Sequence, residues 1–160
     1  MSFKCIFNHP CPIFCPIDLS CRGNEVINPD LTESYGFFSN NDVGSILPNA
    51  IIPLSLQEVE GDGISASVTT FGAINIFGGT YEITYFAQGV VPENGTISAA
   101  LRLNGVVLSG SEIEQTQTPG DIVNMSKTIV FTTLQSGTLE LFNSADETIF
   151  DSASVFIRRL

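Results

Sequence analysis

Hydrophobic and polar side chains alternate along most of the chain from Glu33 onward, and short groups of Gly, Pro, Asn and Asp interrupt the alternation at regular intervals. A period of two residues is typical of β-strands that turn one face toward a core. The strands that we expect lie at residues 33–39, 64–68, 73–77, 80–86, 96–103, 106–108, 122–133, 138–142 and 153–157. No amphipathic helix of useful length is predicted, so the sequence favours an all-β fold, either a sandwich or a jelly roll.

Turn residues and prolines refine this pattern. Asn104–Gly105 stands between two apolar runs and predicts a tight hairpin. Residues 45–54 are apolar but contain two prolines, which fits either an edge strand or a connection.

Several of the expected strands carry apolar side chains on both faces. Phe86 directly follows Tyr85 and so lies on the opposite face of its strand, and Phe156 is related in the same way to Val155. A monomeric sandwich usually separates an apolar inner face from a polar outer face. We therefore expect one outer face to be buried against other subunits. The candidates for this packing are Tyr35, Phe37, Tyr81, Tyr85, Phe86 and Phe156.

The first 22 residues differ from the rest of the chain, because they hold all four cysteines, the only histidine and three of the eight prolines. Prolines remove backbone donors and oppose a helix, so we expect an extended connector at 1–22, a hinge at 23–32 and a jelly-roll domain at 33–160. The connector has too many apolar groups for a free tail, and we expect it to dock on another surface. Its docking candidates are Phe3, Ile6, Phe7, Ile13, Phe14 and Ile17.

The cysteines of the connector allow two interpretations. Cys5, Cys11, Cys15 and Cys21, with His9 among them, include ligand types that zinc takes. No Cys-x-x-Cys pair is present and three prolines stiffen the peptide, so we favour disulfides, within or between subunits. Four cysteines allow three internal pairings, and the sequence does not choose among them.

Charge and composition exclude several classes of function. The net charge is −11, and between Gly23 and Phe156 the only cations are Arg102 and Lys127, which argues against nucleic-acid binding. We interpret the negative charge as an acidic, soluble coat rather than as a cation site. The acidic residues near Glu58 and Asp62 do not form a calcium-loop motif. Outside the connector with its cysteines and histidine, we therefore expect no metal site.

Catalysis and membrane insertion are not expected either. His9 is the only imidazole and lies in a proline-rich peptide, where no pocket would orient it beside a nucleophile, so we expect no enzyme activity, no catalytic residue and no cofactor. No apolar run approaches the roughly 20 residues that a bilayer requires, and the N-terminal run lacks the uninterrupted apolar stretch of a secretion signal. Only 14% of the residues are charged, which suits a secreted or surface β-protein.

Five segments, in the same order, resemble the C-terminal domains of BclA-type spore-surface (exosporium) proteins. Residues 35–40 resemble their opening aromatic strand, 79–86 their G-x-Y-x-I-x-Y/F strand and 101–105 their L-x-x-N-G hairpin. The terminus 153–160 resembles their A-S-(L/I)-x-I-x-(K/R)-L ending. Residues 134–143 resemble their L-x-x-G-D-x-L-x-L-x-N segment, without its Asp and one residue shorter.

The resemblance covers about residues 33–160 and implies the jelly roll of tumour necrosis factor and the complement heads, assembled as a homotrimer. The collagen-like Gly-X-Y stalk of that family is absent, and the cysteine-rich connector stands in its place. In this respect the chain is similar to subunits of spore appendage fibres, in which an N-terminal connector docks into a neighbouring subunit. The resemblance implies a spore-surface location, in the exosporium or the spore coat, which is extracellular after mother-cell lysis. The partners that it implies are the protein itself, as stacked trimers, and other coat or exosporium proteins.

Three hypotheses follow. In the first, the protein is a structural fibre subunit that joins trimer to trimer through residues 1–22. In the second, it is an isolated trimeric adhesion head, anchored through its cysteines, which binds a ligand at loops 40–44, 91–95 or 116–120. In the third, zinc organises the connector so that it docks a partner.

Overall fold

The computed structural model describes residues 34–160, and the connector, the hinge and Glu33 lie outside the described residues. Twelve strands make up the described chain, and none of it is helical. They are β1 (Tyr35–Asn40), β2 (Gly44–Ile46), β3 (Ser55–Glu60), β4 (Ile64–Ala66), β5 (Ile74–Ile76), β6 (Gly79–Val90), β7 (Gly95–Leu103), β8 (Val106–Val107), β9 (Ile113–Gln117), β10 (Val123–Thr133), β11 (Gly137–Phe142) and β12 (Thr148–Arg159). The expected all-β class is confirmed. Among these residues no helix is long and apolar enough to span a membrane.

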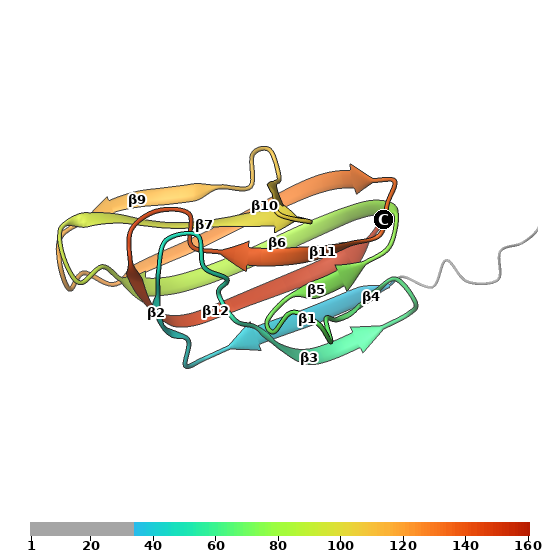
Figure 1. The fold of residues 1–160 in the computed structure, drawn as a ribbon, viewed down its shortest axis with the longest axis horizontal. Helices are drawn as coiled ribbons and strands as arrows, with labels where there is room; N and C mark the ends of the chain where they lie inside the picture. The colour runs from blue at the N-terminus through green and yellow to red at the C-terminus, as the bar shows by residue number, and fades with distance from the viewer. Residues whose placement is uncertain (1–33) are drawn as a thin grey trace, which may run out of the picture. The chain divides into compact units, whose positions relative to one another are not determined.

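The strands form two antiparallel sheets (Figure 1). The β6–β12 sheet has the order β10-β6-β12-β1-β3, and β2 pairs with one end of β12. The β7–β11 sheet has the order β4-β5-β11-β7-β8, and β9 pairs with β7. Apart from the hairpins β4–β5 and β7–β8, neighbouring strands are not consecutive in the sequence, as in β1 and β12, so the fold is a jelly roll rather than a chain of hairpins.

The core lies between the sheets and is filled by one side of each long strand. Along β6 every second residue from Tyr81 to Ala87 is completely buried, and β12 contributes Val155 and Ile157 to the same layer. The Tyr85 hydroxyl lies within hydrogen-bonding distance of the Ala99 and Ser111 carbonyls, so this polar group is satisfied inside the core. No buried side-chain nitrogen or oxygen of the described residues lacks a hydrogen-bond partner.

The Asn104–Gly105 hairpin is present as expected. Asn104 and Gly105 have φ angles of 51° and 79°, which is the left-handed backbone of a type I′ turn. The Asn104 side chain also accepts a hydrogen bond from the Thr138 backbone N–H, at 2.9 Å. The hairpin therefore connects β7 and β8 and also holds the start of β11.

Two strands were not predicted, and two are longer than expected, since β6 continues to Val90 beyond the expected end at residue 86. Ser55–Glu60 forms β3 and Ile113–Gln117 forms β9, although both are largely exposed. β12 begins at Thr148, five residues before the expected segment 153–157. Residues 45–54 contain the end of β2, the isolated bridge of Ile51 to Phe142 and a connection, so both interpretations of this stretch are partly right.

Candidate assembly face

The outer face of the β6–β12 sheet carries a group of aromatic side chains. Phe37 on β1 lies directly opposite Phe156 on β12, and their side chains are 38% and 40% exposed. Tyr35 stacks on Phe156 with ring centroids 6.3 Å apart. Phe86, half-buried, faces outward one strand further along, where it pairs with Ser154. We call Tyr35, Phe37, Phe86 and Phe156 the aromatic face.

Threonines next to the aromatic face pair with each other across β6 and β10. The Thr84 and Thr128 hydroxyls are 2.8 Å apart, and the Thr80 and Thr132 hydroxyls are 3.0 Å apart. Because these hydroxyls are hydrogen-bonded within the sheet, covering them with another surface would leave few polar groups unsatisfied. This part of the sheet can therefore be buried at low cost.

Charged residues lie at the margins of the aromatic face. Arg158 forms an ion pair with Glu82, with 2.6 Å between nitrogen and oxygen, toward one end of the sheet. On the edge strand β3, Glu58 accepts a hydrogen bond of 2.9 Å from the Tyr35 hydroxyl. This hydrogen bond, reinforced by Glu60, raises the pKa of Tyr35 to about 12. The centre of the face is uncharged and its rim is charged, which is the distribution found in protein–protein interfaces.

The structure divides the six residues expected to pack between subunits. Tyr35, Phe37, Phe86 and Phe156 lie together on the outer face. Tyr81 and Tyr85 are completely buried in the core of the single chain, so their inclusion is corrected here. They cannot share a face with Phe86, because Phe86 is an odd number of positions from both. Burial raises the pKa of both tyrosines.

One member of the surface was missed by sequence reasoning. Val130 on β10 lies on the same outer face, opposite Glu82, and its side chain is exposed. It alternates with the inward Ile129 and Phe131, so its position was available from the period of the strand. The connector candidates and all four cysteines lie outside the described residues, so their docking and pairing stay predictions.

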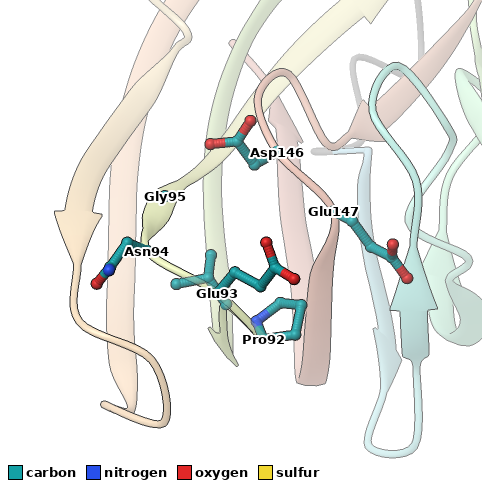
Figure 2. A pocket seen from close by; sticks show the side chains of 7 residues that line it. Pro92, Glu93, Asn94, Gly95, Asp146 and Glu147 are labelled. Atoms are coloured by element: carbon teal, nitrogen blue, oxygen red, sulfur yellow. The ribbon is translucent and has the colours of Figure 1, made fainter.

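A separate hollow of about 520 Å³ lies among loops at one end of the head. It is formed by the β6–β7 loop, which includes Pro92 and Glu93, and by Asp146 and Glu147 before β12 (Figure 2). Asp146 accepts the Thr96 backbone N–H at 2.8 Å. The carboxylates do not form a metal centre, because no group of three or more His, Cys, Asp or Glu residues among those described is arranged to hold an ion.

Comparison with known proteins identifies the fold but no family. No protein-family model matches the sequence, and no curated protein matches it. Murine APRIL at pH 5.0 matches with a TM-score of 0.62 and 11% identity over 80% of this chain and 99% of that one. Eiger TNF of S. frugiperda matches with a TM-score of 0.61 and 12% identity over 80% of this chain and 92% of that one. The globular domain of zebrafish complement 1qA protein matches with a TM-score of 0.53 and 12% identity over 79% of this chain and 96% of that one.

The head has the jelly-roll fold of tumour necrosis factor and the complement C1q domain. This confirms the fold that the resemblance implied. At these identities the likeness extends to the fold alone, since one fold supports many functions.

Proposed function

We propose that the chain is a structural subunit of a spore-surface fibre. In this proposal three heads associate through their aromatic faces, and residues 1–22 of one trimer dock on the next. The protein then acts in the exosporium or spore coat, with itself and other coat or exosporium proteins as partners. It has no catalytic role in this proposal.

The observation that carries the proposal is the uncharged aromatic face. The chain has a net charge of −11, yet the centre of this face has no charged side chain, and Phe37 and Phe156 are both partly exposed at its centre. Aromatic enrichment with depletion of charge is the compositional mark of an interface core. Three copies of this face turned toward a common three-fold axis satisfy these requirements, because their apolar centres meet at the axis and their charged groups stay at the rim.

The connector supports the step from trimer to fibre. It combines apolar side chains that need burial with cysteines that can form covalent links after docking. A contact between the connector of one subunit and the head of the next is heterologous, and such contacts generate open filaments when the rotation between copies does not close. The spore-surface setting is supported by the five segments that resemble exosporium domains.

The test compares the full chain with a variant that lacks residues 1–22. We expect fibres of the full chain in negative-stain images and discrete trimers of the variant by light scattering coupled to size exclusion. A substitution of all four cysteines by serine serves as the matched control, because it keeps the apolar side chains. Fibres that persist in this control assign the joint to packing, whereas their loss assigns it to disulfides.

Two outcomes contradict the proposal in different ways. Unchanged fibres after the deletion would show that the connector is not the joint. Monomeric heads at all concentrations would show that the aromatic face does not bind a second copy.

A second function, an anchored adhesion head, has one observation in its favour. The β6–β7 loop, which includes the expected ligand loop 91–95, lines the hollow of about 520 Å³ shown in Figure 2. This function predicts isolated trimers with or without reductant, and a ligand that saturates them. Substitution of Pro92 by glycine would loosen the loop and weaken that binding, while assembly would stay unchanged.

A further inference from the structure

A second hollow, of about 380 Å³, lies on the outer face of the other sheet, away from the aromatic face. It is formed by β4, β5 and the start of β11. The residues that line it are Ser65, Asn75, Ile76, Phe77, Ser136, Gly137 and Thr138. None of them carries a charge, although the chain as a whole is strongly acidic. The lining of this hollow therefore has no charged group that would attract an ion.

Strand alternation brings the polar and aromatic groups of the hollow to one face. On β5, Ile74 and Ile76 are buried in the core, so Asn75 and the following Phe77 both point outward. Ser65 on β4 lies directly opposite Asn75 on one side, and Thr138 on β11 lies opposite it on the other. The Ser65 hydroxyl, the Asn75 amide and the Thr138 hydroxyl thus form one row across β4, β5 and β11. The Phe77 ring lies beside this row.

Hydrogen bonds fix the main chain at Phe77 and present its ring to solvent. The Phe77 N–H donates to the Gly63 carbonyl at 3.1 Å, and its carbonyl accepts the Tyr81 hydroxyl at 2.9 Å. The side chain is nevertheless 59% exposed. An exposed aromatic ring on an anchored main chain is a stacking surface for the apolar face of a ligand.

The polar row retains hydrogen-bonding capacity. The Thr138 hydroxyl donates to Asn75 Oδ1 at 3.4 Å, which occupies the carbonyl side of the amide. Within the described part of the chain, the Asn75 amide nitrogen donates to no protein acceptor, and the hydroxyls of Ser65 and Ser136 have no protein partner. These groups can both donate to and accept from a hydroxylated ligand.

We infer that this hollow is a binding site for a neutral saccharide. A sugar ring has an apolar C–H face that stacks on Phe77 and hydroxyl groups that bond to Asn75 and Ser65 of the row and to the neighbouring Ser136. Its lack of charge matches the lack of charged groups in the lining. The site lies on a different sheet from the proposed assembly face, so its binding does not require assembly through that face.

The test is saturation-transfer NMR on the full-length protein, which reports on the ligand and works for large assemblies. The probes are glucose, galactose, mannose, rhamnose, N-acetylglucosamine and cellobiose, each titrated to saturation. Phe77→Ala removes the stacking surface, and Asn75→Asp keeps the acceptor for Thr138 but removes the amide donor. Phe71→Ala is the matched control, because Phe71 is also exposed, lies on the loop between β4 and β5 and does not line the hollow.

We expect saturable transfer to at least one probe and affinity that falls by about tenfold or more in Phe77→Ala and Asn75→Asp. Phe71→Ala is expected to bind like the parent. No saturable transfer with any of the six probes, or equal binding by the parent and the Phe77 variant, would overturn the inference. The result does not depend on fibre formation, so the two proposals fail separately.

Discussion

Tyr35 and Phe156 stack across the β1–β12 pair, 6.3 Å between ring centroids, on the outer surface of the head rather than in its core. The two residues are 121 positions apart in sequence and meet because β1 and β12 are adjacent in the sheet. A stacked aromatic pair on the outside of a sheet exposes apolar area that water solvates poorly, and here charged groups such as Arg158 lie beside it. This pair is the basis of the first prediction.

Phe156→Ser should dissociate the proposed trimer while leaving the head folded. Phe156 is 40% exposed, so covering the remainder stabilises the interface by roughly 1 kcal/mol per copy, and for three copies we expect the dissociation constant to rise on the order of a hundredfold. Analytical ultracentrifugation measures the change, and circular dichroism checks the fold. Phe71→Ser, at a side chain that is 79% exposed on a loop, should leave the oligomeric state unchanged. A trimer that tolerates Phe156→Ser would remove the aromatic face from the interface.

Tyr85→Phe should lower the free energy of unfolding. The substitution removes the hydroxyl that is shared by the Ala99 and Ser111 carbonyls inside the core, and unsatisfied buried acceptors cost about 1–3 kcal/mol. Urea denaturation at one fixed protein concentration measures the loss. Tyr35→Phe, whose hydroxyl bonds to Glu58 at the surface, should cost less than Tyr85→Phe, because water can replace the lost partner. Equal costs for the two variants would contradict the assigned roles.

Alkaline pH should destabilise the head through all three of its tyrosines. Burial raises the pKa of Tyr81 and Tyr85 above the ordinary 10.0, and the hydrogen bond to Glu58 raises that of Tyr35 to about 12. A group with a higher pKa in the folded state contributes stability that is complete below its unfolded pKa and is lost as the pH rises through the folded value. We therefore expect this contribution to be constant below pH 10.0 and to fall above it.

Denaturation at a series of pH values measures that fall, and tyrosinate absorbance follows the ionisation itself. Tyr35→Phe should make the decline less steep above pH 10.0. A tyrosinate signal that titrates at pH 10.0 in protein with native circular dichroism would contradict the shifted pKa values.

Gly105→Ala should destabilise the β7–β8 hairpin. Gly105 has a φ of 79°, a left-handed conformation that costs a residue with a Cβ roughly 1–2 kcal/mol. Gly105→Asn is the matched control, because asparagine tolerates this region better and should cost less. Thermal denaturation of the three proteins compares them, and an alanine variant as stable as the parent would rule out the assigned turn.

Much of the fold could be predicted because alternation and turn residues are local signals. The Asn104–Gly105 turn and the strands around Tyr81 and Leu139 follow from their own sequence. β3 could not be found in this way, because every residue of Ser55–Glu60 except Val59 is exposed, and the segment is a strand through its pairing with β1. β9 was missed for the same reason, since Ile113–Gln117 has little apolar periodicity of its own.

The candidate site was predicted in part. Period-two alternation shows that Tyr85 and Phe86 occupy opposite faces, but it does not show which face meets the second sheet. That assignment depends on the strand order, which places Tyr85 against the β7–β11 sheet and Phe86 outside. The hollow beside Phe77 had no sequence signal, because Ser65, Asn75 and Thr138 come together only when three strands align.

The last strand returns to the place where the described chain begins, since the Arg159 N–H donates to the Ser34 carbonyl at 2.8 Å. A peptide or enzyme fused after Leu160 would therefore emerge beside the entry of the chain into the head. The loop at residues 118–121 lies at the far end of the twelve-residue strand β6, roughly 40 Å away. For display of cargo on these heads, an insertion in that loop keeps the added chain clear of both termini of the head, whereas a C-terminal fusion does not.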